Sequence, residues 1–317
     1  MESTSVYSFH PSMFLTEDKD LRALDVEVVV QNPKAIHRYK KLFEEDKTDK
    51  IDTFRIADFL RIGRYNKFLI KEEKYVALQH LIRSRYQLVH QQTECKQHFL
   101  ENLYYTKELN TSVFGATMME ILSDSLSLDE IAEMDLEALA ILLQKKGKGR
   151  FSDPENLAKT IKKAIRDSYR LGNVVQDSVD VVLATYARLI QTLKKQIKEI
   201  EKSITAFFEA IPEARYLTSV PGIGVVYAAG IIAEVGQIER FENEAQLAKY
   251  TGLYWKKSQF GNFESERTPM TRTGNQYLRY YMVEAANSVQ LREATYRAYY
   301  LKKYDEVPKY KHKRALV

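Results

Sequence analysis

The feature that most constrains the fold is a long apolar seam between Val179 and Phe208. Its members alternate spacings of three and four residues and are flanked by Lys and Glu: Ile190, Leu193, Ile197, Ile200, Ile204 and Phe207. Such spacing is typical of a long helix that packs along another helix, as in a coiled coil. A second long polar helix is predicted from Glu72 to about Tyr105. These two helices could pair as an antiparallel hairpin within one chain, or they could pair between two copies.

A glycine-rich turn is predicted at Leu217–Gly224, with the sequence LTSVPGIG, ahead of an apolar run to Ala233. Pro221 ends one helix, and Gly222 and Gly224 permit the positive backbone angles of a tight hairpin. Ile223 is expected to anchor the turn in the core. The next helix then presents free backbone N–H groups to a phosphate, as in a helix-hairpin-helix that grips a DNA backbone. An ordinary turn between two helices is the alternative.

The composition indicates a globular chain of 317 residues with a net charge of +5 and a single cysteine, Cys95. One cysteine excludes a disulfide framework and a cysteine-based metal site, and it fits a cytoplasmic location. No readable signal peptide or membrane span is found, because the longest apolar run is far below the ~20 residues that a span needs. Basic residues gather at 145–150 and 301–317, which permits a nucleic-acid partner; solvated basic surfaces are the alternative.

A pair of carboxylates, Asp49 and Asp52, stands three residues apart at the start of a predicted helix. This spacing places both on one face, where they repel one another unless a divalent cation or basic groups neutralise them. Hard oxygen ligands of this kind suit Mg²⁺. The alternative is structural, since acidic residues in the first turn also interact favourably with the helix dipole.

Three segments together resemble the one-ten family of insertion-sequence transposases. They are MESTSVY at the start, KTDKIDTFRIAD at 47–58, and the stretch from Leu217 through LAKYTGLYWKKSQFGNFESERTPMTRTGNQYLRYYMVEAANSV. The resemblance covers nearly the whole chain. It implies a mainly α fold with a small α/β part, to which the apolar strand Val26–Val30 would belong. The implied domains are a partial RNase H-like nuclease domain of the resolvase type at 1–70, a helical and coiled-coil linker at 71–212, and a compact helical transposase domain at 213–317.

The same resemblance implies functional residues. Glu2, Asp49 and Asp52 would hold Mg²⁺, and Pro221, Gly222, Ile223 and Gly224 would bind DNA. Further phosphate contacts are expected from basic residues of the last domain, namely Lys256, Lys257, Arg267, Arg272 and Arg279. Family members excise and insert their element, or invert DNA, and some are guided by a structured RNA. We therefore expect the chain to bind DNA and a structured guide RNA, to form a homo-oligomer, and not to associate with a membrane.

Two departures from the family pattern bear on activity. The family's first Asp lies on a strand upstream of Met1, so we expect three carboxylates in place of four, weaker metal binding, and a start at an internal Met. Phe260 stands where the family has a serine nucleophile. Ser258 would point to the same side of an extended segment and is a candidate substitute, although a displacement by two residues disfavours it. The sequence thus predicts a DNA transposase that is impaired in this copy; the alternative is a non-catalytic DNA- or RNA-binding remnant that acts as a repressor or subunit.

Tyrosines alternate with Lys and Arg near the end of the chain. Tyr277, Tyr280 and Tyr281 are assigned to the core by their helical spacing. The later tyrosines, from Tyr296 to Tyr310, are left as possible contacts to unpaired bases.

Overall fold

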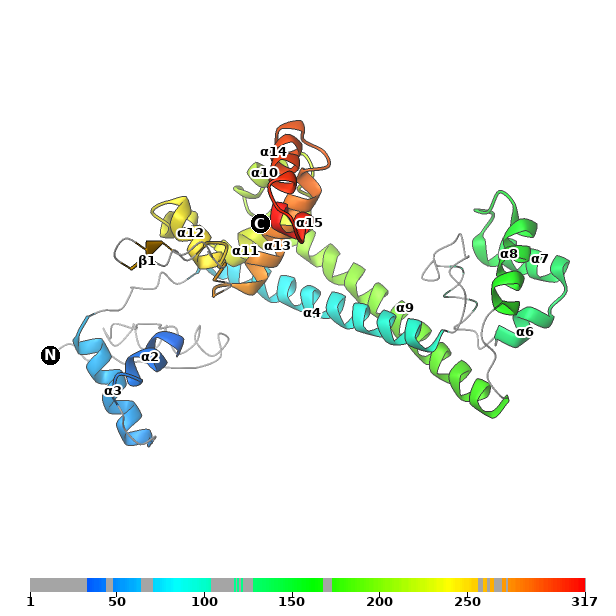
Figure 1. The fold of residues 1–317 in the computed structure, drawn as a ribbon, viewed down its shortest axis with the longest axis horizontal. Helices are drawn as coiled ribbons and strands as arrows, with labels where there is room; N and C mark the ends of the chain where they lie inside the picture. The colour runs from blue at the N-terminus through cyan, green and yellow to red at the C-terminus, as the bar shows by residue number, and fades with distance from the viewer. Residues whose placement is uncertain are drawn as a thin grey trace. The chain divides into compact units, whose positions relative to one another are not determined.

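The computed structural model describes residues 33–43, 48–63, 71–103, 117, 119, 121, 128–167, 173–255, 259–260, 263–264, 270–271 and 273–316. The chain divides into two compact units, residues 1–71 and residues 72–317. Each is presented by itself (Figure 1). The expected strand Val26–Val30, and with it the sheet of a nuclease domain, lies outside the described residues.

In the first unit, helix α2 (Pro33–Lys40) packs against helix α3 (Asp49–Arg61). The Tyr39 ring meets the rings of Phe43 and Phe59 edge to face, with centroids 5.3 Å apart in each case. The Tyr39 hydroxyl also donates a hydrogen bond to Asp58, and this bond, with the Arg61 guanidinium, lowers the pKa of that carboxyl. A small aromatic cluster therefore fixes the two helices together.

The second unit is organised around two long helices, α4 (Glu73–Asn102) and α9 (Asn173–Glu209), which lie side by side and antiparallel (Figure 1). Near one end an Arg85–Glu201 ion pair of 2.8 Å joins them, and near the other the His98 ring stacks on Tyr186. The two helices thus pair within one chain, which answers the question that the sequence left open.

The apolar seam of α9 is largely confirmed, since Ile190, Leu193, Ile197 and Ile204 are buried. Its last predicted member is wrong: Phe207 is 47% exposed, whereas Phe208 is only 4% exposed. A straight α-helix drifts by about 20° per heptad from a strict 3.5-residue repeat, so the inward position moves on by one residue. Phe208 enters the core beside Ile211 and Ala214.

A separate small bundle is formed by α6 (Leu128–Glu133), α7 (Leu136–Gly147) and α8 (Pro154–Arg166). Asp135 and Asp153 cap the starts of α7 and α8 by accepting backbone N–H bonds. This bundle has its own core, which includes Ile131, Leu139, Leu143, Ala158 and Ile161.

The remaining elements follow α9 in the chain. They are α10 (Ala214–Thr218), α11 (Val225–Val235), the 3₁₀ turn η1 (Ile238–Arg240), α12 (Glu244–Thr251), the short strands β1 (Gln259–Phe260) and β2 (Phe263–Glu264), α13 (Gln276–Val289), α14 (Ala294–Asp305) and α15 (Lys311–Leu316). Their main core is shared with the long helices, because Leu78 and Ile82 of α4 pack with Ala228 and Ile232 of α11 and Leu278 of α13. The predicted boundary at 212/213 therefore runs through one continuous core.

Tyr281 lies at the centre of this core, fully buried, and its hydroxyl donates to the carbonyl oxygen of Ile82 at 3.3 Å. Burial raises the pKa of Tyr281 to about 12. Tyr277 and Tyr280 are half-buried beside it, as their spacing predicted. Among the helices that the structure describes, none has both the length and the apolar character that crossing a bilayer requires.

Candidate nucleic-acid interface

The predicted glycine turn is present between α10 and α11. After α10 ends at Thr218, the backbone N–H of Ile223 donates to the carbonyl oxygen of Val220 at 3.0 Å, which closes the turn. Gly222 has a φ of +103°, a conformation that side chains disfavour. Gly224 is extended, with a φ of −83°, and forms the N-cap of α11. Only one of the two predicted positive angles is therefore found.

The back of this turn lies against α13. A Cβ atom on Gly222 would come within 3.0 Å of the backbone of Ser288 and Val289, so the close approach needs glycine as much as the positive φ does. Ile223 is half-buried and packs on the main core, as predicted. Pro221 and Gly224 are exposed. The turn therefore has a packed side and a side open to a ligand.

The start of α11 has the properties of an anion site. The N-cap residue is Gly224, so no side chain accepts hydrogen bonds from the first N–H groups of α11. The first turn of the helix also holds no acidic residue. Its first N–H groups carry the positive end of the helix dipole, which favours a phosphate oxygen. The exposed edge of the turn thus suits a phosphate backbone.

The predicted basic contacts are only partly described by the structure. Arg279 of α13 is half-buried, and its Nη1 donates to the Thr251 carbonyl oxygen at 2.9 Å, at the C-terminus of α12. This bond holds two helices together, and a phosphate contact by Arg279 stays a prediction. Lys256, Lys257, Ser258, Arg267 and Arg272 lie outside the described residues.

The two ends of the segment between Trp255 and Met270 are joined by backbone pairing. Trp255 and Met270 form an antiparallel bridge, and the Thr271 N–H donates to the Tyr254 carbonyl oxygen at 3.1 Å. Further along, β1 pairs with β2 in the register Gln259 to Glu264. Gly274 follows, where a Cβ would meet the Tyr250 carbonyl oxygen at 2.5 Å. The backbone of the returning strand therefore packs directly on the end of α12.

A buried carboxylate, which sequence reasoning missed, joins α11 and the start of α13 to the long helix α4. Glu234 of α11 is fully buried and accepts from the Arg83 guanidinium at 2.7 and 2.9 Å. Gln79 also donates to it at 2.8 Å and Asn275 at 2.6 Å. Asn275 in turn caps α13 by accepting from two backbone N–H groups. The position of Glu234, directly after the apolar run to Ala233, was the available signal.

The carboxylate pair lies in the first unit, at the start of α3. Thr48 caps this helix, accepting from the Ile51 N–H at 3.3 Å. Asp49 is exposed, and Asp52 forms an ion pair with Lys40 of α2 at 2.8 Å. Glu2 lies outside the described residues. Among the residues that the structure describes, no group of three His, Cys, Asp or Glu side chains could hold a metal ion.

Comparison with known proteins identifies the class of protein to which these features belong. Residues 1–106 match a family model described as a transposase of the DEDD type of IS110. Residues 214–301, which include the glycine turn and the segment that follows it, match the model of the transposase IS116/IS110/IS902 family.

The chain therefore belongs to the IS110 family of transposases, and the resemblance found in its sequence is confirmed.

Curated relatives support this assignment. An uncharacterised 43.6 kDa protein of insertion element IS110 from Streptomyces coelicolor is 33% identical over 124 residues, or 39% of this chain and 30% of the relative. A 44.8 kDa protein of element IS116 from Streptomyces clavuligerus is 28% identical over 38% of this chain and 30% of its own. The transposase of element IS1111A from Coxiella burnetii is 28% identical over 29% of this chain and 25% of its own. The chain thus matches less than a third of the length of each of these relatives.

Proposed function

We propose that this chain belongs to a DNA transposase that binds insertion-element DNA through its glycine turn and cleaves and rejoins it with Mg²⁺. The observation that carries the proposal is the start of α11, where Pro221 and Gly224 are exposed and no side chain caps the helix. The chain that contains this turn belongs to a family of transposases. A DNA phosphate would accept hydrogen bonds from the first N–H groups of α11. A guide RNA and self-association belong to this proposal on the family resemblance alone.

Gly224 offers a clean test of DNA binding by the turn. A Cβ at this position would meet no atom within 4 Å, and its φ of −83° suits any residue, so substitution leaves the fold intact. We expect Gly224→Glu to weaken duplex DNA binding on the order of ten-fold, because a carboxylate would stand where a phosphate binds. The measurement is fluorescence anisotropy with a labelled duplex at several salt concentrations.

Gly224→Gln is the matched control, since it adds the same bulk without the charge. It should keep most of the affinity. Equal affinities for the Glu and Gln variants would remove the turn from the DNA interface.

The cleavage chemistry is assigned to Glu2, Asp49 and Asp52. Carboxylate oxygens are the ligands that Mg²⁺ prefers, and the spacing of Asp49 and Asp52, one turn apart at the start of α3, supports the assignment. Bound there, Mg²⁺ would stabilise the negative charge that develops on the phosphate during strand cleavage. Mg²⁺ would compete with Lys40 for the Asp52 carboxylate, since the two side chains form an ion pair of 2.8 Å.

The double substitution Asp49→Ala with Asp52→Ala tests this assignment. We expect it to abolish Mg²⁺-dependent cleavage of element DNA while duplex affinity stays within about two-fold, because the pair lies outside the glycine turn. Cleavage is followed on labelled DNA with and without Mg²⁺. Lys40→Gln is the control for the ion pair alone, and as a partly exposed pair it should change stability by less than about 1 kcal/mol. Parallel loss of cleavage and binding in the double variant would assign the two carboxylates to structure.

A second candidate function is a DNA- or RNA-binding protein without catalysis, such as a repressor or subunit. Two points favour it: Lys40 forms an ion pair with Asp52, and the family resemblance implies that Phe260 occupies the position of the family's serine. Ser258 would then have no catalytic part. This protein would bind DNA with the same salt dependence, but it would not cleave DNA in Mg²⁺.

A further inference from the structure

The last two helices, α14 and α15, pack on one another and carry a concentration of basic and aromatic residues. Residues 294–316 contain seven Lys and Arg against two acidic residues. No side chain of α14 is buried, and Tyr296 and Tyr299 are 56% and 60% exposed. Two large aromatic rings exposed one turn apart on a helix form a contiguous apolar patch that a ligand can contact.

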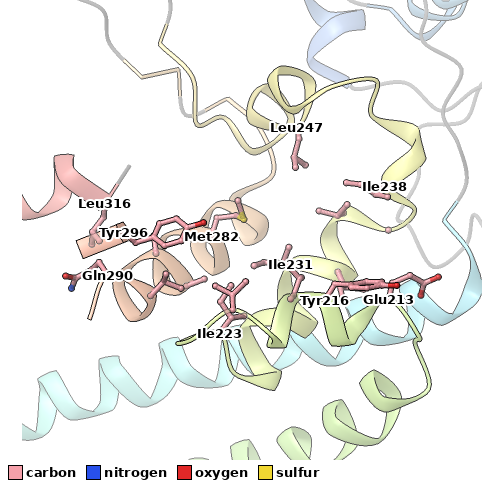
Figure 2. A pocket seen from close by; sticks show the side chains of 18 of the residues that line it. Glu213, Tyr216, Ile223, Ile231, Ile238, Leu247, Met282, Gln290, Tyr296 and Leu316 are labelled. Atoms are coloured by element: carbon pink, nitrogen blue, oxygen red, sulfur yellow. The ribbon is translucent and has the colours of Figure 1, made fainter. Parts of the chain in front are cut away.

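The two rings border a hollow of about 910 Å³ in the second unit. Its inner wall is apolar and includes Ile223 of the glycine turn, Ile231 of α11 and Met282 of α13. Figure 2 shows Tyr296 and Leu316 at one end of this hollow and Tyr216 and Glu213 at the other. The hollow therefore offers an apolar wall beside the exposed tyrosines.

The charge at the two ends of the hollow differs. The end at Leu316 is the end of α15, whose exposed Lys313 and Arg314 precede it, and Lys309 is exposed just before this helix. The opposite end carries Glu72 and Glu213. At that end Lys74 pairs with Glu72 and Arg215 lies over the Tyr216 ring, so the charges largely balance, and a polyanion is attracted to the α14–α15 end.

We propose that the tyrosine face of α14 and the basic residues around α15 bind single-stranded nucleic acid. Unpaired bases would stack on Tyr296 and Tyr299, and the strand's phosphates would follow Lys309, Lys313 and Arg314. A duplex keeps its bases stacked inside and cannot use the tyrosines in this way. The rings and basic residues of this surface come from residues 296–314, and none of them is among the residues assigned to duplex contacts at Pro221–Gly224, although Ile223 lines the same hollow.

The test compares three labelled probes by fluorescence anisotropy: 15-nucleotide oligo(dT), 15-nucleotide oligo(rU) and a DNA duplex of 15 base pairs. The paired substitutions Tyr296→Ala and Tyr299→Ala should weaken binding of a single strand by at least about 25-fold, since each of the two stacked bases is expected to contribute about five-fold or more. Duplex affinity should not change. Tyr296→Phe with Tyr299→Phe keeps both rings and should bind single strands as the natural chain does.

Two further variants separate charge from stacking. Lys309→Gln with Lys313→Gln should reduce the salt dependence of single-strand binding by about 1.4 in the logarithmic slope, whereas the tyrosine variants should leave that slope unchanged. Tyr216→Ala removes an exposed ring from the opposite end of the hollow and should have no effect. A loss on both single-stranded probes means stacking without regard to the sugar, and a loss on one alone identifies DNA or RNA as the ligand.

Unchanged single-strand affinity in the alanine variant, or an equal loss on the duplex, would overturn the proposal. So would a change in oligomeric state in the alanine variant without a change in binding, because the tyrosines would then be a contact between copies. Failure of the glycine-turn proposal looks different, since it appears in the Gly224→Glu variant and on the duplex probe.

Discussion

Replacement of Arg83 by Met is expected to lower the free energy of unfolding of the 72–317 unit by about 3 kcal/mol, because it strands a buried carboxylate. Glu234 cannot be solvated when Arg83 is removed, because its side chain is fully buried. Arg83 supplies two of the hydrogen bonds that this carboxylate accepts. Arg83 itself is 33% exposed, which places the effect at the lower end of the range for a broken buried pair. The measurement is urea unfolding followed by the fluorescence of Trp255, the chain's one tryptophan.

Arg85→Met is the matched control on the same helix. Its partner Glu201 is 33% exposed and can be solvated when the arginine is removed, so we expect a smaller loss, of about 1–2 kcal/mol, which includes the lost bond between Arg85 and the Tyr281 hydroxyl. Glu234→Gln in the Arg83→Met background should recover part of the loss, because the amide removes the charge and still accepts from Asn275. A cost for Arg83→Met no larger than that for Arg85→Met would mean that water reaches Glu234.

The local structure of this chain could be predicted far better than its pairings. Apolar spacing was enough to predict both long helices, and the residue order around Pro221 was enough to predict the turn. Neither pattern identifies the element on which the helix or turn packs, however, because an apolar stripe can pack against any complementary apolar stripe. The pairing of α4 with α9 in one chain therefore came from the structure. A strict heptad predicts Phe207 in the core, but the helix drifts out of that register by this point and buries Phe208 instead.

Long-range polar pairs were the least predictable part of the candidate site. Arg83 and Glu234 are 151 residues apart, and nothing in the neighbourhood of either reveals the other. Asp52 was considered as a metal ligand or as a residue favoured by the helix dipole; its partner Lys40 comes from a different helix. The family resemblance, in contrast, could be found from the sequence alone, since the order of residue types in three separate segments carries it. Glu2, the basic residues of the 256–272 segment and Ser258 stay predictions.

Replacement of Gly230 by Ala is the second change with a large expected effect. Gly230 lies in the middle of α11, where a Cβ would stand 2.3 to 2.6 Å from ring atoms of Tyr281. That ring is fully buried and tied to Ile82 by its hydroxyl, so it cannot move aside without breaking a packed contact. Overpacking of this kind costs about 1–3 kcal/mol, and the better helix propensity of alanine offsets about 1 kcal/mol. Because a distance of 2.3 Å is severe, we expect a net loss of about 2 kcal/mol in the same urea experiment.

A double-mutant cycle with Tyr281→Leu identifies the source of this loss. The smaller leucine leaves room for the new methyl group, so the double variant should be more stable than the sum of the two single changes predicts, by about 1 kcal/mol. Simple additivity would mean that the helix, and not the ring contact, is affected. Gly230 brings α11 against α13 at Tyr281, and Gly222 brings the turn before α11 against α13 at Ser288. The clash at Gly230 should therefore also shift the glycine turn, and Gly230→Ala should weaken duplex binding at temperatures where the chain is still folded.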